Sequence, residues 1–303
     1  RPSAGAGWIA AAAFAIVGTV WLTLFSYKHV EYSSELWWRF AFDAHAPRSL
    51  RALTGAAVVA TVAAVTVLLR PHRGRLAAGL PDWERVRSVV RQSPDSSANL
   101  ALLGDKQLLF SASARAFLMY AQAGGSCVSM GDPVGPEQEW PELVWRFREL
   151  AERHGCRTVF YEVGAGDLGP YLDLGLSLHK LGEEARVDLQ EFSLQGSSRR
   201  KLRYALASLE REGGSFEVID PGGLPAVLPE IRRISDAWLR EKHTREKGFS
   251  LGRFDERYLR HFALAVVRIQ GRIVAFGNLW AGENREECSI DLMRHMPDAP
   301  RDT

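Results

Sequence analysis

Two charged side chains near the carboxyl end of the chain have types and a spacing that suit proton transfer and anion binding. Asp291 and Arg294 stand three residues apart in the segment SIDLMRH. A carboxylate can take a proton from a hydroxyl group or hold an ammonium group, and a guanidinium can grip a phosphate through its planar fork. A salt bridge at the surface end of a strand explains the same pair, so the residues alone leave both interpretations open.

A second charged group lies in the segment EKHTREKGFSLGRF, just before two glycines. Its charges of both signs would suit the recognition of an amino group together with a ribose or a phosphate. An ordinary solvated loop has a similar composition, and a single histidine is weak evidence for a base. The candidate substrate-binding residues are Lys242, His243, Glu246 and Lys247.

A third group, RRKLR, places four cations at the start of a predicted helix. Cations are unfavourable at the positive end of a helix dipole, which suggests that they attract phosphates, such as those of a nucleic acid. A solvated helix end is the alternative. The formal net charge of the chain is only +2, so a nucleic-acid site has to be a local patch. The candidates are Arg199, Arg200, Lys201 and Arg203.

Motifs for bound groups are missing from the sequence. It contains no metal-ligand spacing, no GxSxG elbow and no P-loop, so we expect neither a metal nor a cofactor. The cysteines, Cys127, Cys156 and Cys288, are far apart and in no CxxC spacing, which argues against a disulfide framework. We expect three buried structural thiols in a reducing compartment.

The longest stretches without charge lie at the start of the chain, at residues 8–26 and 52–69. Each approaches the roughly 20 apolar residues that cross a bilayer core. We therefore predict that residues 1–75 form two transmembrane helices, with Trp37 and Trp38 in a short external loop. The alternative is a pair of helices buried in a globular core, which would usually show a polar face.

A basic stretch, RPHRGR, follows the second apolar segment directly. Positive charge collects on the cytoplasmic side of membrane helices, so the charged remainder of the chain should face the cytoplasm. Residues 76–98 are expected to form a linker with a short helix at 83–91, and SPDSSAN to open the part that follows.

The charged remainder alternates between strand and helix patterns. In the first predicted domain, residues 99–194, we expect strands at 107–111, 115–122 and 125–131, a closing GDPVG, a helix at 137–154, a strand at 156–163, and a mixed layer that includes LSLHKLG and ARVDL. In the second, residues 195–303, we expect a helix capped by Ser197 or Ser198, a strand at 215–220, helices at 224–241 and 255–261, and a three-stranded meander at 263–294.

The fold class is therefore α/β or α+β, and the element order in the two predicted domains resembles tandem GNAT-type acyltransferase domains. Longer sequence segments resemble a particular family. The segments FSYKHVEYSSELWW, GDPVG, WPELVWRFRELAERHG, FYEV, LHKLGEEARVDL, KLRYALASLEREG, REKGFSLGRFD and SIDLMRH, in this order, resemble the lysyl- or alanyl-phosphatidylglycerol synthases of the multiple peptide resistance factor family.

This resemblance implies an aminoacyltransferase of the bacterial inner membrane, multi-pass, with a cytoplasmic catalytic part. Its partners would be lysyl- or alanyl-tRNA, phosphatidylglycerol and the membrane, and the sequence leaves a homo-oligomer open. Asp291 would orient or deprotonate the glycerol hydroxyl or hold the donor's amino group, and Arg294 would grip the lipid phosphate. Cells would gain resistance to cationic antimicrobial peptides. Aromatic residues near the cleft could bound a lipid channel or simply belong to the core: Trp238, Phe249, Phe254 and Trp280.

The meander is followed only by PDAPRDT, which leaves a sheet edge uncovered, so we expect the second domain to be incomplete in this sequence. Because PDAPRDT also lacks glycine, a pyrophosphate cradle for acetyl-CoA is disfavoured. Two alternatives stay open. A tRNA-dependent peptidoglycan-bridge aminoacyltransferase also resembles tandem GNAT domains but usually lacks transmembrane helices, and a non-catalytic membrane-anchored module could bind tRNA or lipid.

Overall fold

The computed structural model describes residues 18, 55–56, 58–62, 81–282, 284 and 286–300. Apart from a few positions, the predicted membrane segments at 8–26 and 52–69, the loop between them and the basic stretch at 70–75 lie outside the described residues. Among the residues that are described, no helix is long and apolar enough to cross a membrane. The elements discussed below all belong to the compact unit Arg73–Thr303.

The first sheet contains β1 (Gln107–Phe110), β2 (Phe117–Ala123), β3 (Ser126–Val134) and β4 (Arg157–Tyr161), in that order. Strands β1 to β3 pair antiparallel, whereas β4 pairs parallel to β3. A parallel neighbour requires a crossover, and here η2 (Glu137–Glu139) and α5 (Trp140–Arg153) make it. The predicted strands and the predicted helix of this region are confirmed.

The two faces of this sheet bury different neighbours because side chains alternate along β2. Leu118 and Tyr120 pack against Phe147 of α5. Phe117 and Met119, on the other face, pack with the segment that precedes β1. Burial of each such side chain contributes about 1.5 to 3 kcal/mol, so both faces stabilise the sheet.

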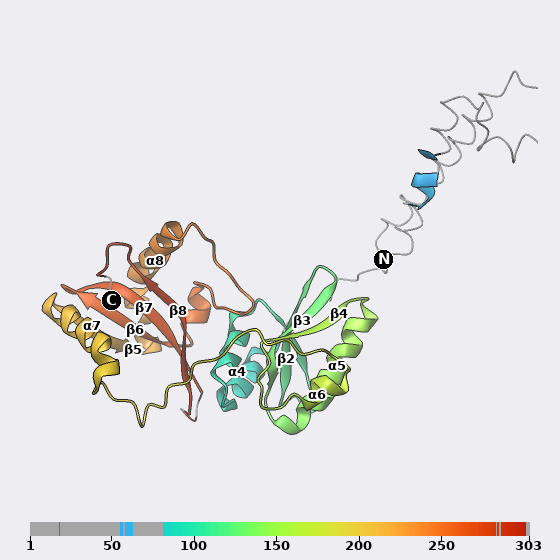
Figure 1. The fold of residues 1–303 in the computed structure, drawn as a ribbon, viewed down its shortest axis with the longest axis horizontal. Helices are drawn as coiled ribbons and strands as arrows, with labels where there is room; N and C mark the ends of the chain where they lie inside the picture. Colours follow the sequence, from blue (N-terminus) through green and yellow to red (C-terminus); the bar gives the residue numbers. More distant parts are fainter. Residues whose placement is uncertain are drawn as a thin grey trace, which may run out of the picture. The chain divides into compact units, whose positions relative to one another are not determined.

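The segment before β1 forms a buried layer between the two sheets (Figure 1). Helix α4 (Trp83–Gln92) is capped by Asp82, whose carboxylate accepts hydrogen bonds from backbone amides of the first turn, and η1 (Ser96–Leu103) follows. Leu100 packs in one core with residues of both sheets, including Trp280. The helix at 83–91 is confirmed. The segment Ser93 to Asn99, predicted as a linker that opens the following part, leads into η1, most of which is buried.

The second sheet contains β5 (Gly214–Ile219), β6 (Ala263–Ile269), β7 (Arg272–Ala281) and β8 (Cys288–His295), all antiparallel. The turn between β6 and β7 has positive φ angles at Gln270 and Gly271, which gives the hairpin a twist that matches its strands. Helix α8 (Leu224–Glu241), which follows η4 (Pro221–Gly223), buries Ile231 and Ile234 against this sheet. The short α9 (Glu256–Leu259) precedes β6. The predicted elements of this region are confirmed, although the second helix is shorter than expected.

The connection between the two sheets departs from the prediction. After α6 (Gly169–Asp173), residues 176–188 form neither helix nor strand, and no strand of either sheet pairs with them. Leu181 and Val187 are exposed there. Helix α7 (Arg200–Arg211) is preceded by η3 (Ser197–Arg199), and the predicted serine caps are wrong, because no side chain caps the start of either helix.

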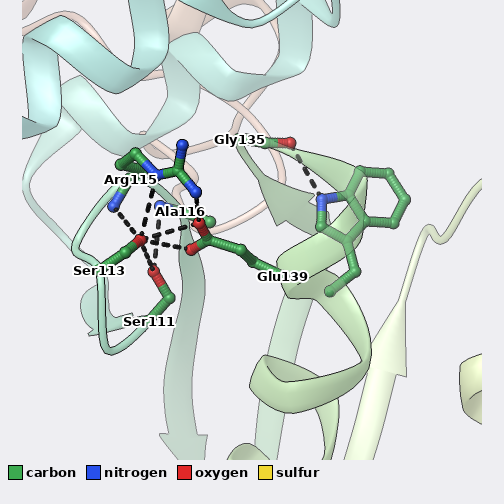
Figure 2. Close-up of polar contacts among 7 residues, drawn as sticks. Ser111, Ser113, Arg115, Ala116, Gly135 and Glu139 are labelled. Carbon is green, nitrogen blue, oxygen red and sulfur yellow. Dashed lines mark hydrogen bonds and ion pairs between the residues drawn. The ribbon is translucent and has the colours of Figure 1, made fainter.

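The GDPVG segment also differs from the prediction, since β3 runs through it to Val134 and only Gly135 leaves the strand. Gly135 has a φ of 120°, and a Cβ atom there would lie 2.5 Å from the carbonyl oxygen of Arg115. Figure 2 shows why this approach is fixed: Ser113 and Arg115 both donate hydrogen bonds to Glu139. The glycine is therefore required by close packing of the β1–β2 turn on β3.

We predict that Gly135→Ala lowers the free energy of unfolding by about 3 kcal/mol, because it combines a backbone clash with a φ that alanine disfavours. Gly124→Ala is the matched control. Gly124 also has a positive φ but nothing within 4 Å of the added carbon, so it should lose only about 1 kcal/mol. Urea unfolding measures both, and equal losses would contradict the packing argument.

Candidate active site

A β-bulge brings Asp291 and Arg294 to one segment of the chain. In a regular strand, residues three apart point to opposite faces. Here the pairing of β7 with β8 shifts opposite Asn278, whose side-chain oxygen accepts a hydrogen bond from the Leu292 amide at 2.8 Å. As a result, Asp291 and Arg294 both contact the segment that joins α8 to α9.

The Asp291 carboxylate is partly buried and held at both oxygens. Oδ1 accepts a hydrogen bond from the Gly252 amide at 2.7 Å, and Oδ2 accepts one from the Tyr258 hydroxyl at 3.0 Å. The Trp280 indole in turn donates to the Tyr258 oxygen at 2.8 Å. Burial raises the pKa of Asp291 above its ordinary value, and the two hydrogen bonds offset part of that rise. This carboxylate is therefore well oriented and more basic than an exposed one.

The Arg294 guanidinium is buried and already paired. Its two terminal nitrogens bind the two carboxylate oxygens of Glu246 at 2.7 and 2.8 Å, and one of them also donates to Ser235 on α8. The Trp238 ring lies 5.4 Å from the guanidinium carbon. A phosphate could bind this fork only by displacing Glu246.

The other predicted residues of the α8–α9 segment point outward. Lys242 pairs with its neighbour Glu241 at 3.2 Å, and both are exposed. His243, which has a positive φ, and Lys247 are exposed as well. Of the four substrate-binding candidates, the structure therefore brings only Glu246 into contact with the Asp291–Arg294 strand.

Two carboxylates hold the glycine-containing part of this segment by its backbone. Asp105 accepts a hydrogen bond from the Phe249 amide at 2.9 Å, much as Asp291 accepts one from Gly252. A Cβ atom on Gly248 would lie 2.8 Å from Asp105, and one on Gly252 would lie 1.7 Å from Asp291. Both glycines are therefore needed for the carboxylates to approach the backbone so closely.

Sequence reasoning missed the Asp105–Lys106 pair. The Lys106 side chain is only 1% exposed, and its ammonium group lies 2.7 Å from Asp105 and 3.3 Å from the carbonyl oxygen of Leu100. Burial lowers the pKa of Lys106, while the Asp105 and Asp291 carboxylates act in the opposite direction. The available signal was a charged pair set directly between two apolar runs, LALL and QLLF.

Comparison with known proteins identifies the family. The family model described as phosphatidylglycerol lysyltransferase, C-terminal, matches residues 87–303. The chain belongs to this family. Phosphatidylglycerol lysyltransferases from Bacillus subtilis (strain 168) and Staphylococcus aureus (strain MSSA476) are 38% and 33% identical to it, over 72% and 74% of the chain. The chain spans 26% of the length of each of these relatives.

A solved structure agrees with this assignment. The structure of L-PGS from Bacillus licheniformis is 37% identical to this chain, with a TM-score of 0.70. The match covers 75% of this chain and 72% of that one. The two-sheet α+β architecture is thus shared with a solved protein of related sequence.

In this phosphatidylglycerol lysyltransferase-type domain, the basic residues at the start of α7 stay apart from Asp291. Helix α7 lies beside β5, which is at the opposite edge of the second sheet from β8 (Figure 1). Arg203 donates to the carbonyl oxygens of Gly196 and Leu194, and Arg199 lies over the Phe192 ring. Arg200 and Lys201 are exposed. The structure does not join this group to the β8 site.

The cysteines and aromatic residues of the domain have mainly structural surroundings. Cys127 and Cys156 are buried, as expected, and burial raises the pKa of Cys127 to about 12. The expectation is wrong for Cys288, which is exposed. Trp280 and Phe249 pack in the core between the sheets, which favours the core interpretation of these two over a lipid channel.

We predict that Glu246→Gln destabilises the fold by about 2 kcal/mol, because it leaves the buried Arg294 charge without its carboxylate. Glu241→Gln is the control, since it breaks an exposed pair and should change stability by less than about 0.5 kcal/mol. Thermal or urea unfolding of both variants measures the difference. Equal stability of the two variants would show that the Arg294–Glu246 pair contributes nothing.

Proposed function

We propose that this chain supplies the catalytic part of a bacterial membrane enzyme that transfers lysine or alanine from aminoacyl-tRNA to the glycerol hydroxyl of phosphatidylglycerol. The observation that carries the proposal is the Asp291 carboxylate, oriented by Gly252 and Tyr258 and made more basic by burial. Membership of the family supports it, and lysine is the first donor to test because the relatives are named lysyltransferases.

The reaction exchanges one ester for another. The lipid hydroxyl oxygen attacks the carbonyl carbon of the aminoacyl ester, and the bond from that carbon to the ribose oxygen of the tRNA breaks. We assign Asp291 to take the hydroxyl proton as the new bond forms and to return it to the leaving ribose oxygen. Because only the ionised form accepts a proton, activity should fall as the pH drops through the raised pKa of Asp291.

The charged α8–α9 segment would meet the donor. Glu246 is 29% exposed, so its carboxylate can hold the amino group of the aminoacyl end while Arg294 fixes it from the buried side. Lys242, His243 and Lys247 are exposed beside it and suit a ribose or a phosphate. In this proposal Arg294 binds the lipid phosphate only if Glu246 turns away to the donor.

Parts of the chain outside the β8 site would contact the nucleic acid and the membrane. The cations on η3 and α7 are exposed and suit a tRNA backbone. The predicted transmembrane helices, residues 1–75, would hold the catalytic part at the inner leaflet, facing the cytoplasm. The lipid would then enter from the membrane and the tRNA from the cytosol. Added lysine would make the membrane surface less anionic and weaken the binding of cationic peptides.

The strand order is compatible with tandem GNAT-type units at 99–194 and 195–303, preceded by a connecting helix in 76–98. Each sheet contains a three-stranded antiparallel meander, β1 to β3 in the first and β6 to β8 in the second. The first meander is followed by a helix and a parallel strand, and the second is preceded by a strand and helices. In this proposal each sheet corresponds to a different part of the same acyltransferase fold.

We predict that Asp291→Asn lowers aminoacyl transfer by about 10²- to 10⁴-fold, because the amide cannot take the hydroxyl proton. The assay uses the full-length protein in phosphatidylglycerol vesicles and follows radiolabelled lysine or alanine from charged tRNA into chloroform-extractable lipid. Asp298→Asn, which changes an exposed carboxylate, should transfer like the wild type.

Three results would contradict this proposal. Wild-type activity of the Asp291→Asn variant would show that Asp291 is not the base. No labelled lipid with either charged tRNA, from folded wild-type protein, would refute the synthase and favour a binding module. Label that enters peptidoglycan precursors in place of lipid would favour the bridge-forming aminoacyltransferase.

A further inference from the structure

Lys106 places an ammonium group in the interior of the protein, where charged side chains are rare. Its side chain is 1% exposed, and its ammonium group contacts the Leu100 carbonyl oxygen of η1 and lies 6.0 Å from the Phe249 ring. Taking an ammonium group out of water is unfavourable, and an apolar residue of similar length would fill the same space without that penalty. A purely structural role therefore leaves the charge itself unexplained.

The charge faces a specific set of partners. The Lys106 ammonium donates to Asp105 and to the Leu100 carbonyl oxygen, and Asp291 on β8 attracts it through space. Arg253, at the end of the α8–α9 segment, repels it. Lys106 thus belongs to the electrostatic surroundings of Asp291, although it stands on the loop before β1 of the other sheet.

Asp105 links the same pair to the backbone of the α8–α9 segment. One oxygen of Asp105 binds Lys106, and the other accepts the hydrogen bond from the Phe249 amide. Phe249 has a φ of 69°, an unfavourable value for a bulky residue, and its ring lies 6.0 Å from the Lys106 ammonium. The pair therefore holds a strained backbone three residues before Gly252, whose amide orients Asp291.

We propose that Lys106, anchored by Asp105, is a positioning residue of the transfer site: the pair fixes the backbone of the segment that orients the Asp291 carboxylate, and the Lys106 ammonium adds a positive charge to the surroundings of that carboxylate. This inference rests on the proposed function of Asp291 as the base. It adds a contribution from the first sheet to a site that is otherwise built on the second.

The polar and charged groups that act most strongly on Asp291 set the expected pH effect. The Tyr258 hydroxyl, the Gly252 amide, the Asn278 side chain on β7 and the Arg294 cation all favour its ionised form, while burial opposes it. Lys106, which stands on the loop before β1 of the other sheet, adds a weaker attraction to the ionised form. Loss of that cation should raise the pKa of Asp291, so the acidic limb of the activity profile should move to higher pH.

The test measures kcat/KM for lysyl or alanyl transfer against pH, with full-length protein, charged tRNA and phosphatidylglycerol vesicles. Lys106→Met keeps the length of the side chain without its charge, and Lys106→Gln is a second uncharged variant with hydrogen-bonding capacity. We expect both to shift the acidic limb to higher pH by about half a pH unit, which is about a threefold loss of kcat/KM below that limb. Lys106→Arg should restore the position of the limb.

Lys180→Met is the matched control, because Lys180 is exposed and forms only a surface pair with Glu183. It should leave the profile unchanged, and circular dichroism establishes that each variant is folded. A merely structural role for Lys106 would lower the amount of active protein without moving the limb. An unmoved limb in both uncharged variants, with an active wild type, overturns this inference alone. A wild type that transfers no amino acid at any pH overturns the proposed function and this inference with it.

Discussion

The hydrogen bond from the Gly252 amide to Asp291 is the contact on which the arrangement of the candidate site depends. It forms only because residue 252 has no side chain, since a Cβ atom would lie 1.7 Å from the carboxylate. The β-bulge opposite Asn278 and the Tyr258 hydroxyl complete the orientation of the same group. A strand, a loop and a helix are therefore all fixed relative to one carboxylate, as acid–base chemistry requires.

The two sheets contribute to this site through the buried layer formed by α4 and η1. Hydrophobic residues of that layer pack with both sheets, and the Asp105–Lys106 pair follows directly after it. A buried ion pair contributes little net stability. The presence of Asp105 and Lys106 here is therefore better explained by the α8–α9 segment that they hold in position. The hydrophobic residues of this layer hold the two sheets together. The polar Asp105–Lys106 pair beside it fixes the backbone of the α8–α9 segment.

Much of the fold could be predicted from the sequence, because β2, α5 and α8 show clear strand or helix periodicity and the turn at Gln270 has its expected residues. Asp291, Arg294 and Glu246 were proposed from their types and a family resemblance, and the structure brings them together. The charged pair Asp105–Lys106 between two apolar runs was visible in the sequence, but its contact with Phe249, which lies 144 residues from Asp105, is one that no local pattern encodes. Periodicity also cannot reveal that η1 is buried.

The most direct test of the account compares Gly252→Ala with Gly222→Ala in the full-length protein, by transfer of labelled lysine or alanine from tRNA to phosphatidylglycerol. Gly222 has open space around an added carbon, whereas Gly252 does not. The account predicts a loss of about 100-fold for Gly252→Ala, because the carboxylate must move, and wild-type transfer for Gly222→Ala. Undiminished transfer by a folded Gly252→Ala protein would contradict the claim that this contact positions the catalytic base.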